Sequence, residues 1–319
     1  MVVAARHFLR DDDLSPAEQA SVLDLATELK AAPYDARPLA GPRTVAIMFD
    51  KPTLRTQASF AAGIAELGGF PMIVDALLAQ VGVRESVADT ARVLGRQAAA
   101  VVWRTHDQSR LEEMATYAGV PVVNALTDQF HPCQALADLL TIREHRGELA
   151  GQTLAFVGDP ACNMGHSLLL AGATAGMQVR VSGPESFQPD PVVLARAREL
   201  AASTGGSADY VADPAEAARE ADVLATDTWV SMGREDEAEA RAGAFAPWRL
   251  DEGLLAQAAA DAIVLHCLPA YRGKEITAEV LDGPCSVVWD EAENRRHVQK
   301  AVLCLLLAES GNATTMEGA

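Results

Sequence analysis

Short apolar runs alternate with helix-like stretches along the whole chain, and this alternation is the feature that most limits the fold. The runs are rich in β-branched residues and lack a polar face, as in parallel strands that are covered on both sides. The candidate strands are residues 45–49, 72–74, 100–103, 120–123, 154–157, 179–182, 223–226, 263–266 and 287–289. The candidate helices are residues 57–67, 111–117, 134–146, 164–175, 191–203, 251–259 and 294–309. Strands that alternate with helices predict an α/β protein with right-handed crossovers.

A polar stretch at residues 145–152 follows a long candidate helix and precedes a fresh strand, so it divides the chain. The 319 residues fit two domains at about 150 residues each. We expect two doubly wound parallel-sheet domains, residues 1–147 and 148–293, with the C-terminal helix 294–309 joining the first. Ligands of such sheets bind beyond the carboxyl ends of the strands, which predicts an active site in the cleft between the domains.

The composition excludes several classes of partner. With 26 basic and 44 acidic residues the net charge is −18, which repels nucleic acid and anionic lipid. No apolar run approaches the ~18 residues that span a bilayer, and the charged first 13 residues do not resemble a secretory signal. The five cysteines are widely spread and lack the spacing of a zinc site. These features predict a cytoplasmic protein that binds neither membrane nor nucleic acid.

Cationic side chains follow the candidate strands of the first half. The strand 45–49 leads into Lys51 and Arg55 at the start of a helix, where Thr53 or Thr56 is the expected N-cap. Arg104 and His131 follow the strands 100–103 and 120–123. Free N–H groups at a helix start, together with such cations, favour an anion-binding site. Solvated cations and a helix-capping histidine are the plainer alternatives.

The strand ends of the second half carry acidic and polar groups instead. The turn after the strand 154–157 lacks the glycine spacing of a dinucleotide site, and its Asn163 either binds a carboxylate or caps a helix. Asp227 follows the strand 223–226 and precedes a long acidic loop of the kind that often forms a lid. Cys267 is an orienting hydrogen-bond partner, a buried apolar residue or, least favoured, a nucleophile. Cations in one half and an acid in the other suit the joining of an anionic donor to a cationic acceptor.

Four motifs strongly resemble those of the ornithine carbamoyltransferases. They are HPCQALADL at residues 131–139, DTWVSMG at 227–233, HCLPAYRG at 266–273 and WDEAENR at 289–295. The likeness extends over about residues 5–309, and HPCQ together with HCLP separates the chain from the aspartate carbamoyltransferases, which share the overall plan. The resemblance implies carbamoyl transfer from carbamoyl phosphate to the side-chain amine of L-ornithine, a step of arginine biosynthesis, without a metal or organic cofactor.

The resemblance also implies roles for individual residues. The positions that match catalytic residues are Arg55, Arg104, His131, Asp227 and Cys267. Those that match the carbamoyl-phosphate site are Thr53, Leu54, Arg55, Thr56, Gln80, Arg104, His131, Gln134, Cys267, Leu268 and Arg295. Asn163, Asp227, Ser231 and Met232 match the ornithine site. Gln80 matches a glutamine that reaches a neighbouring subunit, which implies a homotrimer with shared active sites.

One motif departs from the family. The phosphate loop of the family reads Ser-Thr-Arg-Thr-Arg, whereas the five positions here are Thr53-Leu54-Arg55-Thr56-Gln57. A hydroxyl is lost at Leu54 and a charge at Gln57. Two alternatives to ornithine carbamoylation therefore stay open: a specialised paralogue that carbamoylates another primary amine, for example in secondary metabolism, and a catalytically weak anion-binding regulatory protein.

Overall fold

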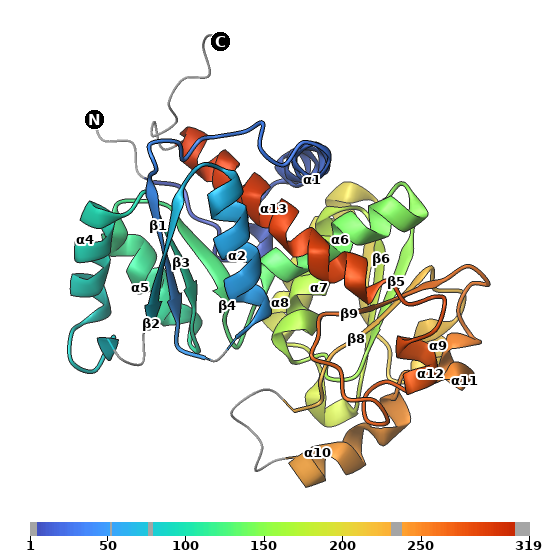
Figure 1. The fold of residues 1–319 in the computed structure, drawn as a ribbon. Helices are drawn as coiled ribbons and strands as arrows, with labels where there is room; N and C mark the ends of the chain where they lie inside the picture. The colour runs from blue at the N-terminus through green and yellow to red at the C-terminus, as the bar shows by residue number, and fades with distance from the viewer. Residues whose placement is uncertain (1–4, 52, 76–78, 231–237, 310–319) are drawn as a thin grey trace. The chain divides into compact units, whose positions relative to one another are not determined.

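The computed structural model describes residues 5–51, 53–75, 79–230 and 238–309. The chain forms two compact units (Figure 1), the first made of Met1–Cys133 with Arg295–Ala319 and the second of Gln134–Asn294. The first unit contains a four-stranded sheet and the second a five-stranded sheet. Every paired strand in both sheets is parallel, which confirms the predicted α/β fold with two doubly wound sheets.

The sheet of the first unit has the strand order β2-β1-β3-β4. Its strands are β1 (Thr44–Phe49), β2 (Phe70–Asp75), β3 (Ala100–Arg104) and β4 (Val122–Leu126), and its own helices are α1 (Pro16–Ala31), α2 (Arg55–Glu66), α4 (Val87–Gln97) and α5 (Gln108–Ala118), after a short turn η1 (Asp11–Asp13). Met48 and Trp103 point from the strands into a core that Leu94 of α4 and Leu111 of α5 complete. The carboxyl ends of β1, β3 and β4 are adjacent, so the loops that follow them meet at one edge.

The sheet of the second unit has the order β7-β6-β5-β8-β9. Its strands are β5 (Thr153–Val157), β6 (Gln178–Ser182), β7 (Ser207–Tyr210), β8 (Val223–Thr226) and β9 (Ile263–His266). The helices are α7 (Asn163–Thr174), α8 (Pro191–Thr204), α9 (Pro214–Ala218), α10 (Ala238–Phe245), α11 (Glu252–Leu255) and α12 (Ala278–Leu281), with short turns η2 (Glu185–Phe187) and η4 (Ala246–Trp248). From β5 the strands are added toward one edge of the sheet as β6 and β7, and then toward the other edge as β8 and β9. The loops after β5 and β8 therefore flank the switch point of the sheet.

Two helices contribute residues to both units. They are α6 (Pro132–Arg146) and α13 (Val288–Glu309). Within the first unit the buried Lys300 of α13 donates hydrogen bonds to Glu66 Oε2 at 2.6 Å and to the carbonyl of Leu29 at 3.0 Å. Within the second unit Asn294 Nδ2 of α13 donates to Thr141 Oγ1 of α6 at 2.9 Å. These bonds fix the register of α13 against its neighbours in each unit.

Some predicted elements differ from the structure. The predicted strand at residues 287–289 is wrong, because Val288 begins α13 and the acidic Asp290 and Glu291 in its first turn suit a helix N-terminus. The polar, half-exposed strand β7 was not predicted, since Ser207–Tyr210 contains no apolar run. β4 starts two residues later than predicted because Pro121 has no N–H to donate to a neighbouring strand.

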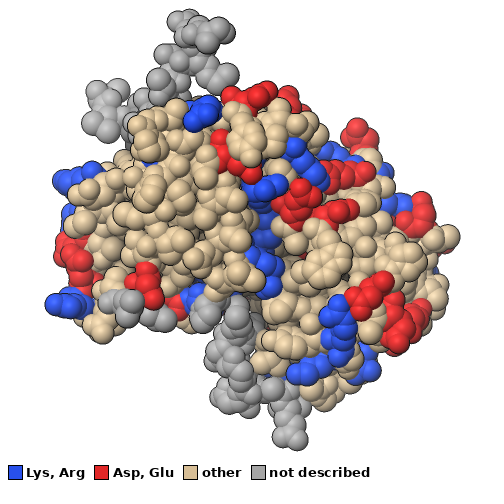
Figure 2. All heavy atoms as spheres, viewed as in Figure 1, with Lys and Arg blue, Asp and Glu red and all other residues tan. Residues whose placement is uncertain are grey.

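Surface charge and hydropathy give two further observations. Acidic and basic side chains are interspersed among larger uncharged areas on the face drawn in Figure 2. Of the helices in the described ranges, none has the length and apolar character needed to cross a lipid bilayer.

Candidate active site

The first unit gathers arginines around one buried hydroxyl. Thr56 lies in the first turn of α2, and its Oγ1 accepts hydrogen bonds from Arg104 Nη1 at 3.3 Å and Arg295 Nη2 at 2.9 Å. Arg104 ends β3 and Arg295 lies on α13, and only 6% and 3% of their surfaces are exposed. Buried guanidinium groups favour a bound anion, because they form strong charge-assisted hydrogen bonds to phosphate or carboxylate oxygens. The structure therefore brings Arg104 and Arg295 together.

His131 belongs to the same cluster. It immediately precedes α6 and is 3% exposed. Burial, followed by the positive charges of Arg295, Arg104 and Arg55, lowers the pKa of His131 well below its ordinary value of 6.5. The imidazole is therefore neutral at physiological pH, and it can donate one hydrogen bond without adding a further charge.

We expect the His131 ring to show no titration between pH 8 and pH 6. Because its pKa is lowered, the proton is taken up only at a more acidic pH. The measurement is the ¹³Cε1 chemical shift of labelled histidine, with the resonance assigned by its loss in His131→Gln and free imidazole as the reference in the same sample. A His131 midpoint at or above 6.5 would contradict the electrostatic account.

Bonds between strand ends hold the entrance to the phosphate loop. Asp50 follows β1 and its Oδ2 accepts from Thr105 Oγ1 at 2.5 Å. The next residue, Lys51, forms an ion pair with Asp128, which follows β4. Asp50 and Lys51 are both buried, so these two contacts hold the backbone that enters the loop to the segments that follow β3 and β4.

The loop itself departs from the expected capping. Leu54, not Thr53 or Thr56, is the N-cap of α2, and no side chain caps the helix there. The Thr56 hydroxyl is engaged by two arginines instead. Thr53 is half-buried, whereas the Leu54 side chain is 78% exposed. The Leu54 side chain, which stands where the family has a threonine hydroxyl, is thus directed to solvent. The backbone N–H groups at the start of α2 are not capped by a side chain and can still bind an anion.

Gln80 lies in an exposed turn before α4 and makes no side-chain hydrogen bond to the described residues. Its backbone φ of 51° lies in the left-handed region that non-glycine residues seldom adopt. Arg110 Nη2 donates to the carbonyl of the next residue, Val81, at 2.8 Å, and Arg110 Nη1 lies 3.5 Å from Asp50 Oδ2. The turn that presents Gln80 is therefore tied to the end of β1 through Arg110.

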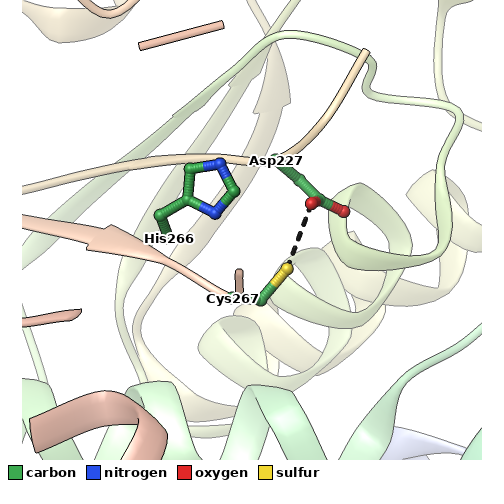
Figure 3. A group of neighbouring side chains, drawn as sticks. All are labelled: Asp227, His266 and Cys267. Atoms are coloured by element: carbon green, nitrogen blue, oxygen red, sulfur yellow. Dashed lines mark hydrogen bonds between the residues drawn. The ribbon is translucent and has the colours of Figure 1, made fainter. Parts of the chain in front are cut away.

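In the second unit Asp227, His266 and Cys267 lie close together (Figure 3) at the ends of the neighbouring strands β8 and β9. Cys267 Sγ donates to Asp227 Oδ1 at 3.1 Å, and the same oxygen accepts from the backbone N–H of Thr228 at 2.7 Å. The structure thus joins the acid and the thiol that follow these two strands. The carboxylate is held as an acceptor at the sheet's switch point.

Sequence reasoning did not identify the pair formed by His266 and Glu275. His266 Nε2 lies 3.2 Å from Glu275 Oε1, and both side chains are buried. His266 Nδ1 accepts from the backbone N–H of Leu268 at 2.9 Å, so the hydrogen on the ring is at Nε2. Leu268 has a φ of 56°, and this bond holds it there. The motif HCLP contained the histidine, but nothing in the sequence linked it to Glu275.

The electrostatics of this half disfavour a cysteine nucleophile. Burial, and then the Asp227 charge, raises the pKa of Cys267 well above 9.0, so the thiol keeps its proton. Burial also raises the pKa of Asp227 from 3.8, while His266, Cys267 and Thr228 lower it. Cys267 is therefore a hydrogen-bond donor that orients Asp227, in agreement with the ranking of its roles from the sequence.

Asp227, His266 and Cys267 are also the residues best placed to hold a metal ion within the described ranges. One ligand atom from each lies within 4.8 Å of the others. Both His266 nitrogens already have partners, however, in Glu275 and the Leu268 N–H. A metal would have to displace one of these bonds, so the arrangement does not favour a resident ion.

Gln134, another predicted site residue, forms hydrogen bonds within the second unit. Its Nε2 donates to Asp138 Oδ1 at 2.7 Å and to Glu291 Oε1 at 2.9 Å. A small pocket of about 10 Å³ lies beside these groups, and its lining includes Asp138, Glu291 and Cys267. The pocket thus brings two buried carboxylates near the end of β9.

The remaining predicted residues are those that the resemblance assigns to the ornithine site. Asn163 is the first residue of α7 and is half-buried, and the N-cap of that helix is Cys162, whose Sγ accepts from Gly165 N–H. The alternative that Asn163 caps the helix is therefore wrong. Ser231 and Met232 lie outside the described residues. Beyond them, Arg241 of α10 pairs with Asp159 in the turn that leads to α7.

Two family models cover nearly the whole chain. Residues 6–144 match the carbamoyl-P binding domain of the aspartate/ornithine carbamoyltransferases, and residues 150–306 match the Asp/Orn binding domain. An ornithine carbamoyltransferase of Clavibacter sepedonicus is 62% identical over 305 residues, which are 96% of this chain and 99% of the relative.

Solved structures agree with the sequence relatives. The ornithine carbamoyltransferase of Pyrococcus furiosus has a TM-score of 0.91 at 43% identity and covers 96% of this chain and 98% of its own. An acetylornithine transcarbamylase complexed with acetylcitrulline has a TM-score of 0.85 at 29% identity, over 94% of this chain and 98% of its own.

Proposed function

Because the chain belongs to the aspartate/ornithine carbamoyltransferase family, we propose that it transfers the carbamoyl group of carbamoyl phosphate to the side-chain amine of L-ornithine. The products are L-citrulline and phosphate, in a step of arginine biosynthesis. The observation that carries the proposal is the pair of complementary half-sites, a buried arginine cluster around Thr56 in one unit and the Asp227–Cys267 pair in the other.

The cationic half binds the anionic donor. The loop of Thr53, Leu54, Arg55 and Thr56 holds the phosphate, largely through backbone N–H groups, while Arg104 and Arg295 neutralise its charge. The neutral His131 donates to the carbonyl oxygen of the carbamoyl group, where negative charge develops during attack. Gln134, Cys267 and Leu268 contact the carbamoyl end, and Gln80 reaches the site of a neighbouring subunit.

The acidic half binds and activates the amine. An amine like that of lysine has a pKa of about 10.4, so it arrives as an ammonium and must lose a proton before attack. Asp227 attracts the ammonium and accepts that proton directly or through solvent, with Cys267 holding the carboxylate. The new C–N bond then forms as the C–O bond to phosphate breaks, and phosphate leaves with the electron pair and takes up the second proton of the attacking nitrogen. Asn163, Ser231 and Met232 hold the α-amino acid end of ornithine.

The proposal extends to assembly and location. Residues 1–147 with the helix 294–309 form the carbamoyl-phosphate domain, and residues 148–293 form the ornithine domain. The protein acts as a cytoplasmic homotrimer whose active sites are shared between subunits through Gln80. Gln80 is exposed, and Arg110 of the same subunit holds its turn through the Val81 carbonyl, which supports a contact between Gln80 and a neighbouring subunit.

The direct test is citrulline formation from carbamoyl phosphate and L-ornithine, followed by mass spectrometry. N-acetylornithine, shorter diamino acids and putrescine serve as competing acceptors in parallel reactions. We expect robust turnover with ornithine. A product formed only with another amine would assign the chain to a specialised paralogue, and no product with any amine would overturn the transferase proposal.

Restoring a hydroxyl in the phosphate loop should improve the binding of the donor. A hydrogen bond to a charged group contributes about 1.5–3 kcal/mol, so Leu54→Thr is expected to lower the KM for carbamoyl phosphate by about tenfold. Since the Leu54 side chain is 78% exposed, the smaller threonine leaves no buried cavity. Initial rates at saturating ornithine measure the effect.

The matched control for Leu54→Thr is Val192→Thr, an exposed apolar position on α8 that belongs to neither half-site. It should leave both KM values unchanged. A KM for carbamoyl phosphate within twofold of wild type in Leu54→Thr would mean that backbone N–H groups alone set the affinity of the loop.

A further inference from the structure

The carboxamide of Gln134 is held by two buried carboxylates within the second unit. Gln134 and Asp138 lie one turn apart on α6, so their side chains share a face of the helix. Glu291 approaches from the first turn of α13. The exposed fractions are 1% for Gln134, 2% for Asp138 and 1% for Glu291, so water competes little for the hydrogen bonds between them.

This arrangement fixes which end of the amide faces the carboxylates. A carboxylate oxygen accepts hydrogen bonds, and of the two ends of a carboxamide only the NH₂ donates them. Nε2 donates to both Asp138 and Glu291, at 2.7 and 2.9 Å. A flipped amide would place Oε1 against two acceptor oxygens, which is costly for buried groups. Oε1 is therefore held on the side away from the two acids.

Glu291 has a second bond that makes a carboxylate necessary at this position. Its Oε2 accepts from the backbone N–H of His266 at 2.8 Å, while its Oε1 accepts from Gln134. A neutral glutamine has only one oxygen and cannot serve both donors in this way. Glu291 thus ties the orientation of Gln134 to the residue that immediately precedes Cys267.

We propose that Asp138 and Glu291 are positioning residues that hold Gln134 Oε1 as the acceptor for the carbamoyl NH₂, and thereby make the site select a carbamoyl group over an acetyl group. The proposal rests on the proposed function, in which Gln134 contacts carbamoyl phosphate. Of the groups on that substrate only the NH₂ donates hydrogen bonds, whereas the carbonyl and phosphate oxygens accept them. An acceptor held in place distinguishes an NH₂ from a methyl group of similar size, because the buried acceptor is left unpaired by the methyl.

The test compares two stable phosphonates that differ only at this group. Phosphonoacetamide carries the NH₂ and acetonylphosphonate carries a methyl in its place. Isothermal titration calorimetry gives the dissociation constant of each for the intact enzyme. We expect wild type to prefer phosphonoacetamide by about tenfold or more, the value of one hydrogen bond in a buried site. In Glu291→Gln and in Asp138→Leu, which removes the acceptor of the Gln134 Nε2 bond, this preference should fall to threefold or less.

The two ligands share the phosphonate, so binding of acetonylphosphonate reports whether a variant is folded and its phosphate site intact. Should Glu291→Gln not fold, Asp138→Leu carries the same test. Glu144→Gln is the matched control, because Glu144 accepts from Asn294 Nδ2 at 2.7 Å between the same two helices, α6 and α13. It should keep the wild-type preference.

Two results would overturn the proposal. One is an equal loss of both ligands in Glu291→Gln and Asp138→Leu, which would show a general structural role. The other is an unchanged preference in both variants. Failure of the proposed function looks different, since then wild type would bind neither phosphonate, or Gln134→Ala would keep the full preference for phosphonoacetamide.

Discussion

Replacing Arg104 by methionine is expected to lower the turnover number for carbamoyl transfer by about 10²–10³-fold. The Arg104 guanidinium lies at the end of β3 and shares the Thr56 hydroxyl with Arg295. In the proposed mechanism it is preorganised toward the place where the leaving phosphate gains charge, so its effect should be larger in the transition state than in the bound substrate. Methionine keeps most of the volume and removes the charge. The measurement is kcat and both KM values from citrulline formation.

The control for Arg104→Met is Arg92→Met on α4. Arg92 is an exposed arginine of the same unit that pairs with Asp89, and its loss should leave kcat unchanged. A rise in the KM for carbamoyl phosphate with an unchanged kcat would indicate that Arg104 only binds the substrate. A turnover number within threefold of wild type would remove Arg104 from the catalytic group.

The central strands could be predicted because they are buried on both faces. β3 reads Ala-Val-Val-Trp-Arg, and all five of its residues are buried, so the apolar run is plain in the sequence. β7 is an edge strand with one buried residue, Ala208, and its sequence carries no such signal. The Val-Val-Trp run at residues 287–289 has the composition of a strand, but its Val288 is buried at the start of a helix. Tertiary packing decided that case against local propensity.

The residues of the two half-sites could be predicted from the sequence where they lie at the carboxyl ends of strands. Arg104, Asp227 and Cys267 directly follow strands or end them, and parallel topology brings such residues to one edge. Glu275, Asp138 and Glu291 do not directly follow a strand, and each acts through another side chain. Glu291 is 157 residues from Gln134, and no pattern in the sequence connects the two. Groups that orient other groups therefore emerge only from the folded structure.

Changing Asp227 to asparagine should cost about 10²–10⁴-fold in kcat/KM for ornithine, the range of a lost general base. Asparagine has the same shape and keeps an oxygen that can accept from Cys267 Sγ and from the Thr228 N–H. What it lacks is the charge that attracts the ammonium and the basicity that accepts its proton. The expected loss is therefore chemical and not structural. Citrulline formation at subsaturating ornithine gives kcat/KM directly.

The pH dependence distinguishes this role from simple binding. Because burial raises the pKa of Asp227 above its ordinary 3.8, the wild-type kcat/KM for ornithine should fall on the acid side at a pH above that value, as the carboxylate takes up a proton. Asp227→Asn should lack this acid limb and keep only the rise with pH that deprotonation of the substrate amine produces. Asp209→Asn, an exposed position on β7 of the same unit, should match wild type in rate and profile. An unchanged acid limb in Asp227→Asn, or a loss of less than tenfold, would assign proton transfer to another group.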